Sequence, residues 1–323
     1  MATSESARFA DERVLVIFPG ALGDLICLIP TLRALSRRHR GAALELMARE
    51  ELARFAVLRI GFGQSRIARG HSLDRREVAA LFAEDPGPAD AAQLFRPFAR
   101  IYSFFASDDA RFRRGLEAAA APGAVSVHAF RPARDSHVAA AYLDEISECA
   151  AAPDGASDAR LDVLPCDIDE ARRALARLGL EDKRIILLFP GSGAASKNWP
   201  PENFALLAKL LAPPLEPLVV IGPAERSLES LFVTHSVARL REQPLGTVAG
   251  MAHIAAGFVG NDSGVAHLAA AAGAPGVAIF GPTDPKRWRP LGRVRVLQAT
   301  RLADLTPAEV AAALGEISAT VDF

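Results

Sequence analysis

The feature that most constrains the fold is a series of short apolar runs, each followed by a stretch with helical periodicity. The first run, RVLVIF at 13–18, is continuous rather than alternating, which is typical of a strand buried on both faces of a parallel sheet. A glycine-containing turn follows, and a predicted helix at 23–38 then carries leucines on one side and ends in a basic cluster. The same half of the chain contains further predicted strands at 43–47, 101–105 and 124–128 and predicted helices at 74–82, 109–119 and 136–149.

A second series of the same kind begins near Arg184. Its predicted strands contain IILLF, PLVVIG, GFVGND, GVAIFG and RVRVL, and a last helix is predicted near 306–314. Between the two series, AAPDGASD at 151–158 has the composition of a linker. We therefore predict two domains, 1–155 and 156–323, each a doubly wound parallel sheet of the Rossmann-like α/β class, with the last helix able to pack back on the first domain.

Composition bounds the class of protein and its partners. The formal net charge of -1 gives no overall attraction to nucleic acid or to a membrane. The three cysteines, Cys27, Cys149 and Cys166, have no metal-ligand spacing, so we expect no zinc site and no disulfide scaffold, and a cytoplasmic location fits best. Residues 1–13 lack the features of a signal peptide, and no apolar stretch of about 18 residues occurs, so we expect neither export by that route nor a membrane span.

The first candidate site is FPGALGD at 18–24, at a strand-to-helix turn. Gly20 and Gly23 let the backbone pass close to a ligand, and the helix offers free N–H groups toward an anion or hydroxyl. Only G-x-x-G is present where a dinucleotide fingerprint needs G-x-G-x-x-G, so NAD binding is poorly supported. Asp24 lies at the carboxyl edge of the first strand, where open α/β sheets place their chemistry. Alternatively, Asp24 only stabilises the helix N-terminus through the dipole.

The second candidate site is FPGSGAASKNWPPENF at 189–204. Its small residues, Ser192 among them, expose backbone N–H groups and Lys197 adds a positive charge, which together suit a diphosphate. The loop is no Walker A motif, because G-x-x-x-x-G-K-[ST] is absent. The alternative is an ordinary loop with a surface lysine.

The third candidate site, GNDSGVAHLAAAAG at 260–273, is the most informative. Asp262 and Ser263 are good N-cap residues for an alanine-rich helix, Gly264 permits close approach at its first turn, and His267 falls one turn in. A pyrophosphate at this helix would meet both the N–H groups and the imidazole. Because Asp262 would repel that group, its carboxylate must turn to its own helix or to a ribose hydroxyl.

Weaker signals lie nearby. Glu225 follows the strand PLVVIG, where an acidic side chain can hold ribose hydroxyls, and the loop at 281–290 could close over the same ligand with Thr283 and Asp284. Arginines near predicted loops of the first half could contact an anionic acceptor, but the sequence does not rank them. They are Arg66, Arg69, Arg75, Arg76, Arg111, Arg113, Arg114, Arg131 and Arg134.

Taken in order, these segments resemble family 9 glycosyltransferases, the heptosyltransferases of lipopolysaccharide core synthesis and their relatives. The resemblance rests on LGD after the first strand, PGSGAASKNWPPENF, NDSGVAHLAAAAGAP and GPTDP, in the family's order and approximate spacing. It implies a GT-B fold, with two Rossmann-like domains facing a cleft, the acceptor on the N-terminal domain and the nucleotide sugar on the C-terminal domain. It also implies inverting transfer without a metal or other cofactor.

The resemblance further implies roles for single residues. Asp24 matches the general base, Lys197 the phosphate-binding lysine and Glu225 the ribose-binding glutamate, while Asp262, Ser263, Gly264 and His267 match the segment beside the diphosphate. The expected reaction moves a heptose from an ADP-sugar to a lipopolysaccharide-core or related saccharide, with peripheral contact at the inner membrane if that acceptor is lipid-linked. The alternatives are a sugar-nucleotide epimerase of similar fold, which needs no acceptor, and a noncatalytic nucleotide-sugar-binding protein.

Overall fold

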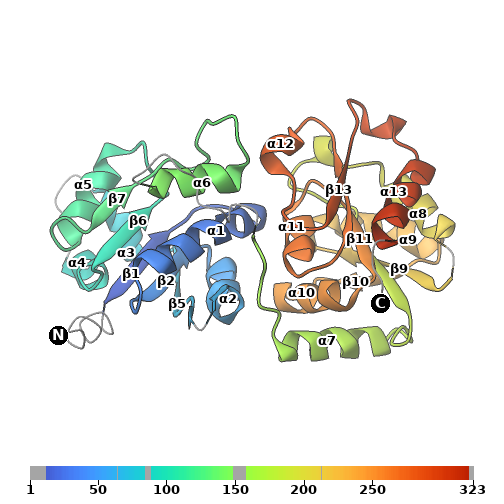
Figure 1. The fold of residues 1–323 in the computed structure, drawn as a ribbon, viewed down its shortest axis with the longest axis horizontal. Coiled ribbons are helices and arrows are strands. Elements are labelled where there is room, and N and C mark those ends of the chain that lie inside the picture. The colour runs from blue at the N-terminus through green and yellow to red at the C-terminus, as the bar shows by residue number, and fades with distance from the viewer. Residues whose placement is uncertain (1–11, 64, 84–88, 148–157, 212, 320–323) are drawn as a thin grey trace. The chain divides into compact units, whose positions relative to one another are not determined.

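The computed structural model describes residues 12–63, 65–83, 89–147, 158–211 and 213–319. The chain divides into two compact units, 1–156 and 157–323, which Figure 1 draws in blue to green and in yellow-green to red. The described residues do not include the first 11 residues of the N-terminal segment, Cys149, or the predicted linker up to Ser157. Within the described part, no helix is long and apolar enough to cross a membrane.

The first unit is built on a five-stranded sheet in the order β5-β2-β1-β6-β7, and every neighbouring pair in it is parallel. A separate antiparallel pair is formed by β3 (Gly61–Phe62) and β4 (Ser65–Arg66). The strands of the main sheet are β1 (Arg13–Ile17), β2 (Ala43–Ala48), β5 (Arg69–Ser72), β6 (Arg100–Ser103) and β7 (Val125–Val127).

Helices cover both faces of this sheet, as expected for a doubly wound fold. On one face, Leu15 and Ile17 of β1 pack into a core with side chains of α4 and α5, while α1 packs against α6. The predicted helix at 74–82 is in fact a short α-helix that continues as a 3-10 turn. The helical segments are α1 (Leu22–Arg38), α2 (Glu50–Arg59), α3 (Arg76–Ala79), η1 (Ala80–Phe82), α4 (Ala89–Phe95), α5 (Ala110–Ala119) and α6 (Val138–Ile146).

The second unit is built on a six-stranded sheet in the order β10-β9-β8-β11-β12-β13, again with every neighbouring pair parallel. Numbered within the unit, this is the Rossmann order 3-2-1-4-5-6. The strands are β8 (Arg184–Phe189), β9 (Leu215–Ile221), β10 (Ala238–Arg241), β11 (Gly257–Asn261), β12 (Gly276–Phe280) and β13 (Val294–Gln298).

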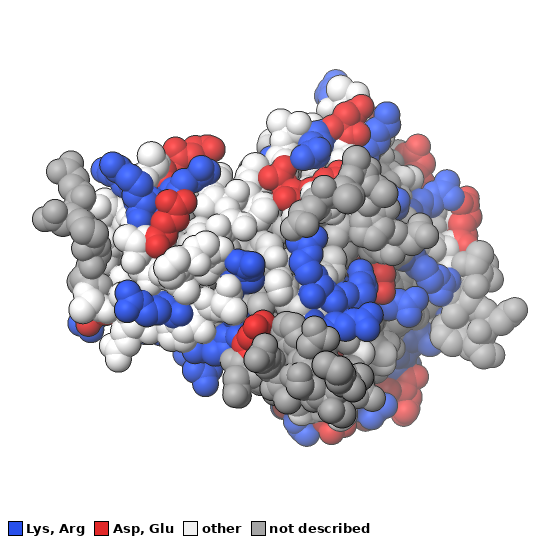
Figure 2. Space-filling model, turned by 60° about the vertical axis from the view of Figure 1, so that its left-hand side comes forward, with Lys and Arg blue, Asp and Glu red and all other residues white. Residues whose placement is uncertain are grey.

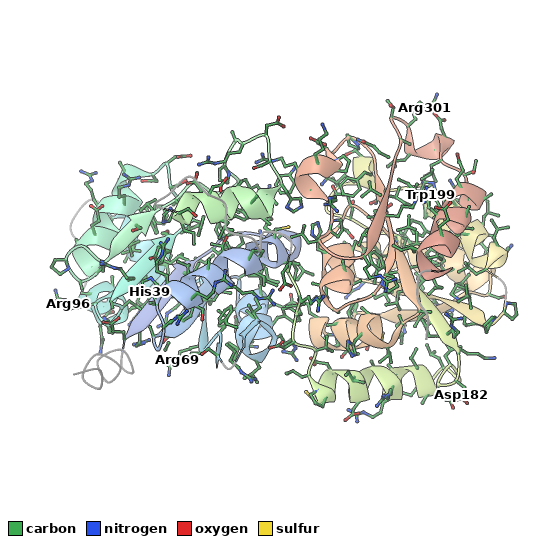
Figure 3. All side chains as sticks on the ribbon, viewed as in Figure 1. His39, Arg69, Arg96, Asp182, Trp199 and Arg301 are labelled. Atoms are coloured by element: carbon green, nitrogen blue, oxygen red, sulfur yellow. The ribbon has the colours of Figure 1, made fainter. Side chains whose placement is uncertain are left out.

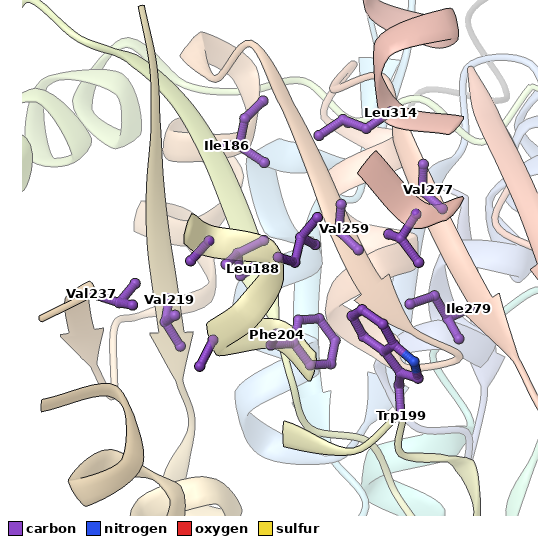
Figure 4. Close-up of a cluster of buried hydrophobic side chains, with 14 of the residues drawn as sticks. Ile186, Leu188, Trp199, Phe204, Val219, Val237, Val259, Val277, Ile279 and Leu314 are labelled. Atoms are coloured by element: carbon purple, nitrogen blue, oxygen red, sulfur yellow. The ribbon is translucent and has the colours of Figure 1, made fainter. Parts of the chain in front are cut away.

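One face of the second sheet carries α8, α9 and α13, and α7, α10 and α11 form the other helical layer. Trp199, labelled in Figure 3, lies inside this unit and is fully buried. Figure 4 shows it beside Phe204 among aliphatic side chains of the sheet. The helical segments are α7 (Pro165–Ala176), η2 (Ala195–Lys197), α8 (Pro201–Leu210), η3 (Pro223–Leu228), α9 (Glu229–Thr234), α10 (Leu245–Ile254), α11 (Gly264–Ala271), α12 (Pro285–Trp288), η4 (Leu302–Asp304) and α13 (Pro307–Ala319).

Candidate active site

Strand order defines one place in each sheet where a ligand can enter between loops. In the first unit the chain moves outward from β1 through β2 on one side and through β6 on the other, so the loops after β1 and β6 diverge at the carboxyl edge. Such a switch point is where open α/β sheets bind ligands. The loop after β1 leads through Gly20 to Asp24 in the first turn of α1.

Asp24 is held by three hydrogen bonds. Arg131, from the loop after β7, donates from Nε to Oδ1 at 2.9 Å and from Nη2 to Oδ2 at 2.7 Å. The backbone N–H of Ala21 donates to Oδ2 at 3.1 Å, so the carboxylate also caps α1. The Asp24 side chain is only 4% exposed, whereas that of Arg131 is 49% exposed. A buried carboxylate is thus fixed by a bidentate guanidinium that reaches it from solvent.

Aromatic side chains surround this pair. Phe18 makes edge-to-face contacts with Phe104, Phe130 and Tyr142, at centroid distances of 5.5 to 5.9 Å. A Cβ added to Gly20 would lie 2.4 Å from the Phe18 ring and 2.5 Å from the Asp24 Cβ. The close approach that requires glycine here is therefore to the protein's own side chains. Burial, followed by the charge of Asp24, raises the pKa of the Tyr142 hydroxyl.

An open cavity of about 810 Å³ lies at the same edge of the first sheet. The segment after β6 forms most of its wall, with Phe104 and Phe105 followed by Asp108 and Asp109. Arg111 also lines it, but its guanidinium pairs with Asp109 at 3.3 Å. Pro19 and Phe130 complete the apolar part of the wall.

In the second unit the switch point lies between β8 and β11. Lys197, in the loop after β8, places Nζ 2.8 Å from Oδ2 of Asp262, which follows β11. Thr283 donates its hydroxyl to the same oxygen at 2.6 Å. Asp262 thus turns to Lys197 and Thr283 rather than to its own helix, and Ser263 is the N-cap, since its hydroxyl accepts from the N–H of Ala266.

Asn261, the last residue of β11, ties the Lys197 loop to the sheet. Its side chain is fully buried. Its Oδ1 accepts from the Trp199 N–H at 3.0 Å, and its Nδ2 donates to the Pro190 carbonyl at 2.7 Å. One amide therefore fixes both ends of the loop that carries Lys197, and no local sequence signal identifies this role of Asn261.

The other predicted donor-side residues lie around this point. Glu225, in the turn after β9, packs against the backbone of Gly191, since a Cβ there would lie 2.0 Å from its carboxylate oxygen. Ser192 donates its hydroxyl to the carbonyl of Ala194 within the same loop, at 2.8 Å. Gly264 opens α11, and His267 in that helix is buried, with 4% exposure.

Charges of both signs are distributed over the surface. Figure 2 shows Lys, Arg, Asp and Glu side chains on one face, with uncharged residues between them.

In the part of the chain that the structure describes, no group of three or more His, Cys, Asp or Glu side chains could hold a metal ion.

The fold and the two switch points belong with a known class of protein. The chain is a member of glycosyltransferase family 9 (heptosyltransferase), whose model matches residues 104–303. It is 28% identical over 130 residues to lipopolysaccharide heptosyltransferase 3 of Escherichia coli (strain K12), a match that covers 37% of each chain.

Two solved structures share the whole fold. A glycosyl transferase family 9 structure from Veillonella parvula DSM 2008 has a TM-score of 0.77 at 16% identity, over 97% of this chain and 99% of that one. The E. coli ADP-heptose lps heptosyltransferase II has a TM-score of 0.73 at 19% identity, over 95% and 98%. These likenesses confirm the predicted α/β class with two doubly wound parallel sheets.

Proposed function

We propose that this protein is an inverting, metal-independent glycosyltransferase that moves a heptose from ADP-heptose onto a lipopolysaccharide-core or related saccharide. Membership of glycosyltransferase family 9 supports transfer over epimerisation. The observation that carries the proposal is a buried carboxylate, Asp24, at the switch point of one sheet, combined with the Lys197 loop and a helix N-terminus at the switch point of the other.

The second unit, 157–323, takes the donor in this proposal. Lys197 and the free N–H groups at the start of α11 offset the charge that develops on the diphosphate as it leaves. Asp262 holds the lysine in place through the 2.8 Å contact. Glu225 is positioned for ribose hydroxyls, and Ser192, Gly264 and His267 complete the donor site. The name of the related E. coli ADP-heptose lps heptosyltransferase II supports ADP-heptose as the donor.

The first unit, 1–156, takes the acceptor in this proposal. The cavity beside β6 presents Phe105 and Phe130, and such rings suit the apolar face of a sugar, while Asp108 can accept hydrogen bonds from its hydroxyls. The protein works in the cytoplasm, and at the inner membrane when the acceptor is lipid-linked.

In the reaction, the acceptor hydroxyl oxygen attacks the anomeric carbon from the face opposite the diphosphate. Asp24 takes the hydroxyl proton, the new C–O bond forms, and the anomeric C–O bond breaks with its electron pair passing to the diphosphate. The anomeric configuration inverts. Gly20 allows the close approach of the turn to Asp24, and Gly23 lies in the first turn of α1. The low solvent exposure of the Asp24 side chain limits competing transfer to water.

The test is Asp24→Ala, assayed with ADP-heptose and a core saccharide in the presence of chelator. A positioned base contributes roughly 10² to 10⁴ in rate, so kcat should fall by about that factor while ADP affinity is nearly unchanged. An equal loss of ADP affinity would overturn the role of Asp24. Loss of wild-type turnover in chelator would overturn the metal-independent mechanism.

A further inference from the structure

We infer that Arg131 is a positioning residue that holds Asp24 so that Oδ1 is the oxygen that receives the acceptor proton. This inference rests on the proposed function. Its basis is the bidentate contact between the Arg131 guanidinium and the Asp24 carboxylate, at 2.9 and 2.7 Å.

The hydrogen bonds on the two carboxylate oxygens are unequal. Among the described residues, Oδ2 accepts from Arg131 and from the Ala21 N–H, whereas Oδ1 accepts from Arg131 alone. A carboxylate oxygen has about two lone-pair sites. Oδ2 is therefore filled by the protein, and Oδ1 keeps one site for the proton of an acceptor hydroxyl.

The backbone of Arg131 points to the same role. Its φ is +54°, in the left-handed region that residues other than glycine rarely adopt. The guanidinium also lies over the Phe130 ring, with Cζ 5.1 Å from the ring centroid. Phe130 in turn packs edge-to-face on Phe18, the residue that ends the first predicted strand. The loop thus adopts an uncommon conformation in which the guanidinium reaches Asp24.

The charge of Arg131 also acts on the Asp24 carboxylate. Arg131 is the cation that contacts Asp24, Tyr142 reaches toward both from α6, and Cys27 of α1 lies near Tyr142. The hydrogen bond to Asp24 raises the pKa of Arg131, against the effect of burial. Removing this cation leaves a nearly buried carboxylate without the positive charge beside it, and a nearby positive charge favours the ionised form of a carboxylate.

The matched control lies in the same loop. Arg134 pairs with Glu145 at 3.0 Å and its side chain is 47% exposed, close to the 49% of Arg131. Arg134→Gln therefore removes an arginine of equal exposure and an ion pair of similar length, without touching Asp24. Arg131→Lys keeps the charge but loses the fork that holds both oxygens.

The experiment measures kcat/KM against pH for the wild type, Arg131→Gln, Arg131→Lys and Arg134→Gln, with ADP affinity as a second readout. For Arg131→Gln we expect the acidic limb to move to higher pH and kcat at neutral pH to fall about 10- to 100-fold, with ADP affinity unchanged. Arg131→Lys should restore the position of the limb but not the full kcat. Arg134→Gln should match the wild type.

Two results would overturn the inference: an acidic limb that stays in place in Arg131→Gln, or full activity in Arg131→Lys. If Arg131→Gln does not fold, the lysine variant decides by its kcat alone. Asp24→Asn separates the two proposals. If Asp24→Asn keeps wild-type turnover, the general-base assignment fails and the role of Arg131 fails with it, whereas an inactive Asp24→Asn with an unshifted Arg131→Gln refutes only the role of Arg131.

Discussion

Replacing Asn261 by alanine tests how the donor site is built. In the wild type its amide satisfies the Trp199 N–H and the Pro190 carbonyl, at 3.0 and 2.7 Å. Alanine removes the amide at this fully buried position and leaves both backbone groups without their hydrogen bond to it. Since Pro190 and Trp199 flank the loop that carries Lys197, the change should lower stability and weaken diphosphate binding together.

The expected size follows from the two contacts. Each buried polar group left without a partner costs roughly 1 to 3 kcal/mol, so two of them predict a loss of about 2 to 6 kcal/mol in the unfolding free energy of the second unit. Asn261→Asp should be at least as harmful. It keeps the acceptor for the Trp199 N–H but sets a buried carboxylate against the carbonyl of Pro190.

Tryptophan fluorescence during urea unfolding is the assay, because the chain's two tryptophans, Trp199 and Trp288, both belong to the second unit. Asn203→Ala, a partly exposed asparagine in α8, is the control and should leave the midpoint nearly unchanged. A loss below about 1 kcal/mol for Asn261→Ala would refute the reasoning, since it is less than the cost of one unpaired buried group. So would an unchanged ADP affinity.

Two further predictions concern charged groups. Lys197→Ala should weaken ADP binding about 10- to 100-fold, as expected for a charge-assisted contact. Adenosine binding by this variant, and ADP binding by the Lys209→Ala control, should stay near wild type. Calorimetry measures both ligands, and an equal loss of adenosine binding would argue against a phosphate contact. Burial of Glu45 would raise its pKa, but hydrogen bonds from His71 and Arg13 outweigh it and hold the pKa at about 2, below the ordinary 4.5. This pairing stabilises the fold by roughly 3 kcal/mol above pH 4.5, and the stabilisation is lost as pH falls toward 2. Glu45→Gln should therefore flatten the acid limb of the curve of stability against pH, followed by circular dichroism. An unchanged curve would contradict the stabilising role of this pairing.

Much of the fold could be predicted because its buried strands are continuous apolar runs. In the two parallel sheets, the strands that escaped prediction are β5 (RGHS) and β10 (ARLR), which lie at sheet edges and have no such run. Backbone pairing to β2 and the contact between His71 and Glu45 stabilise β5 in the sheet, whereas the buried strands are stabilised by apolar side chains. Neither of these two interactions can be predicted from the local sequence.

The candidate site was only partly predictable. Turn and cap chemistry located Asp24, Lys197 and Ser263, since glycine-rich turns and N-cap residues are local signals. Arg131 could not be ranked among nine arginines, because its partner lies 107 residues away. Asn261 was missed because its role depends on two long-range backbone contacts. The orientation of Asp262 likewise depends on Lys197 and Thr283 rather than on its own helix.

The most direct test of the proposed donor site is calorimetric titration of the intact protein with ADP, UDP, GDP and adenosine in chelator, which requires no knowledge of the acceptor. We expect ADP to bind more tightly than UDP and GDP, and at least about tenfold more tightly than adenosine, because Lys197 and α11 bind the diphosphate. Tighter binding of UDP or GDP would contradict the ADP-heptose donor. Binding of none of the diphosphates would contradict the donor site itself.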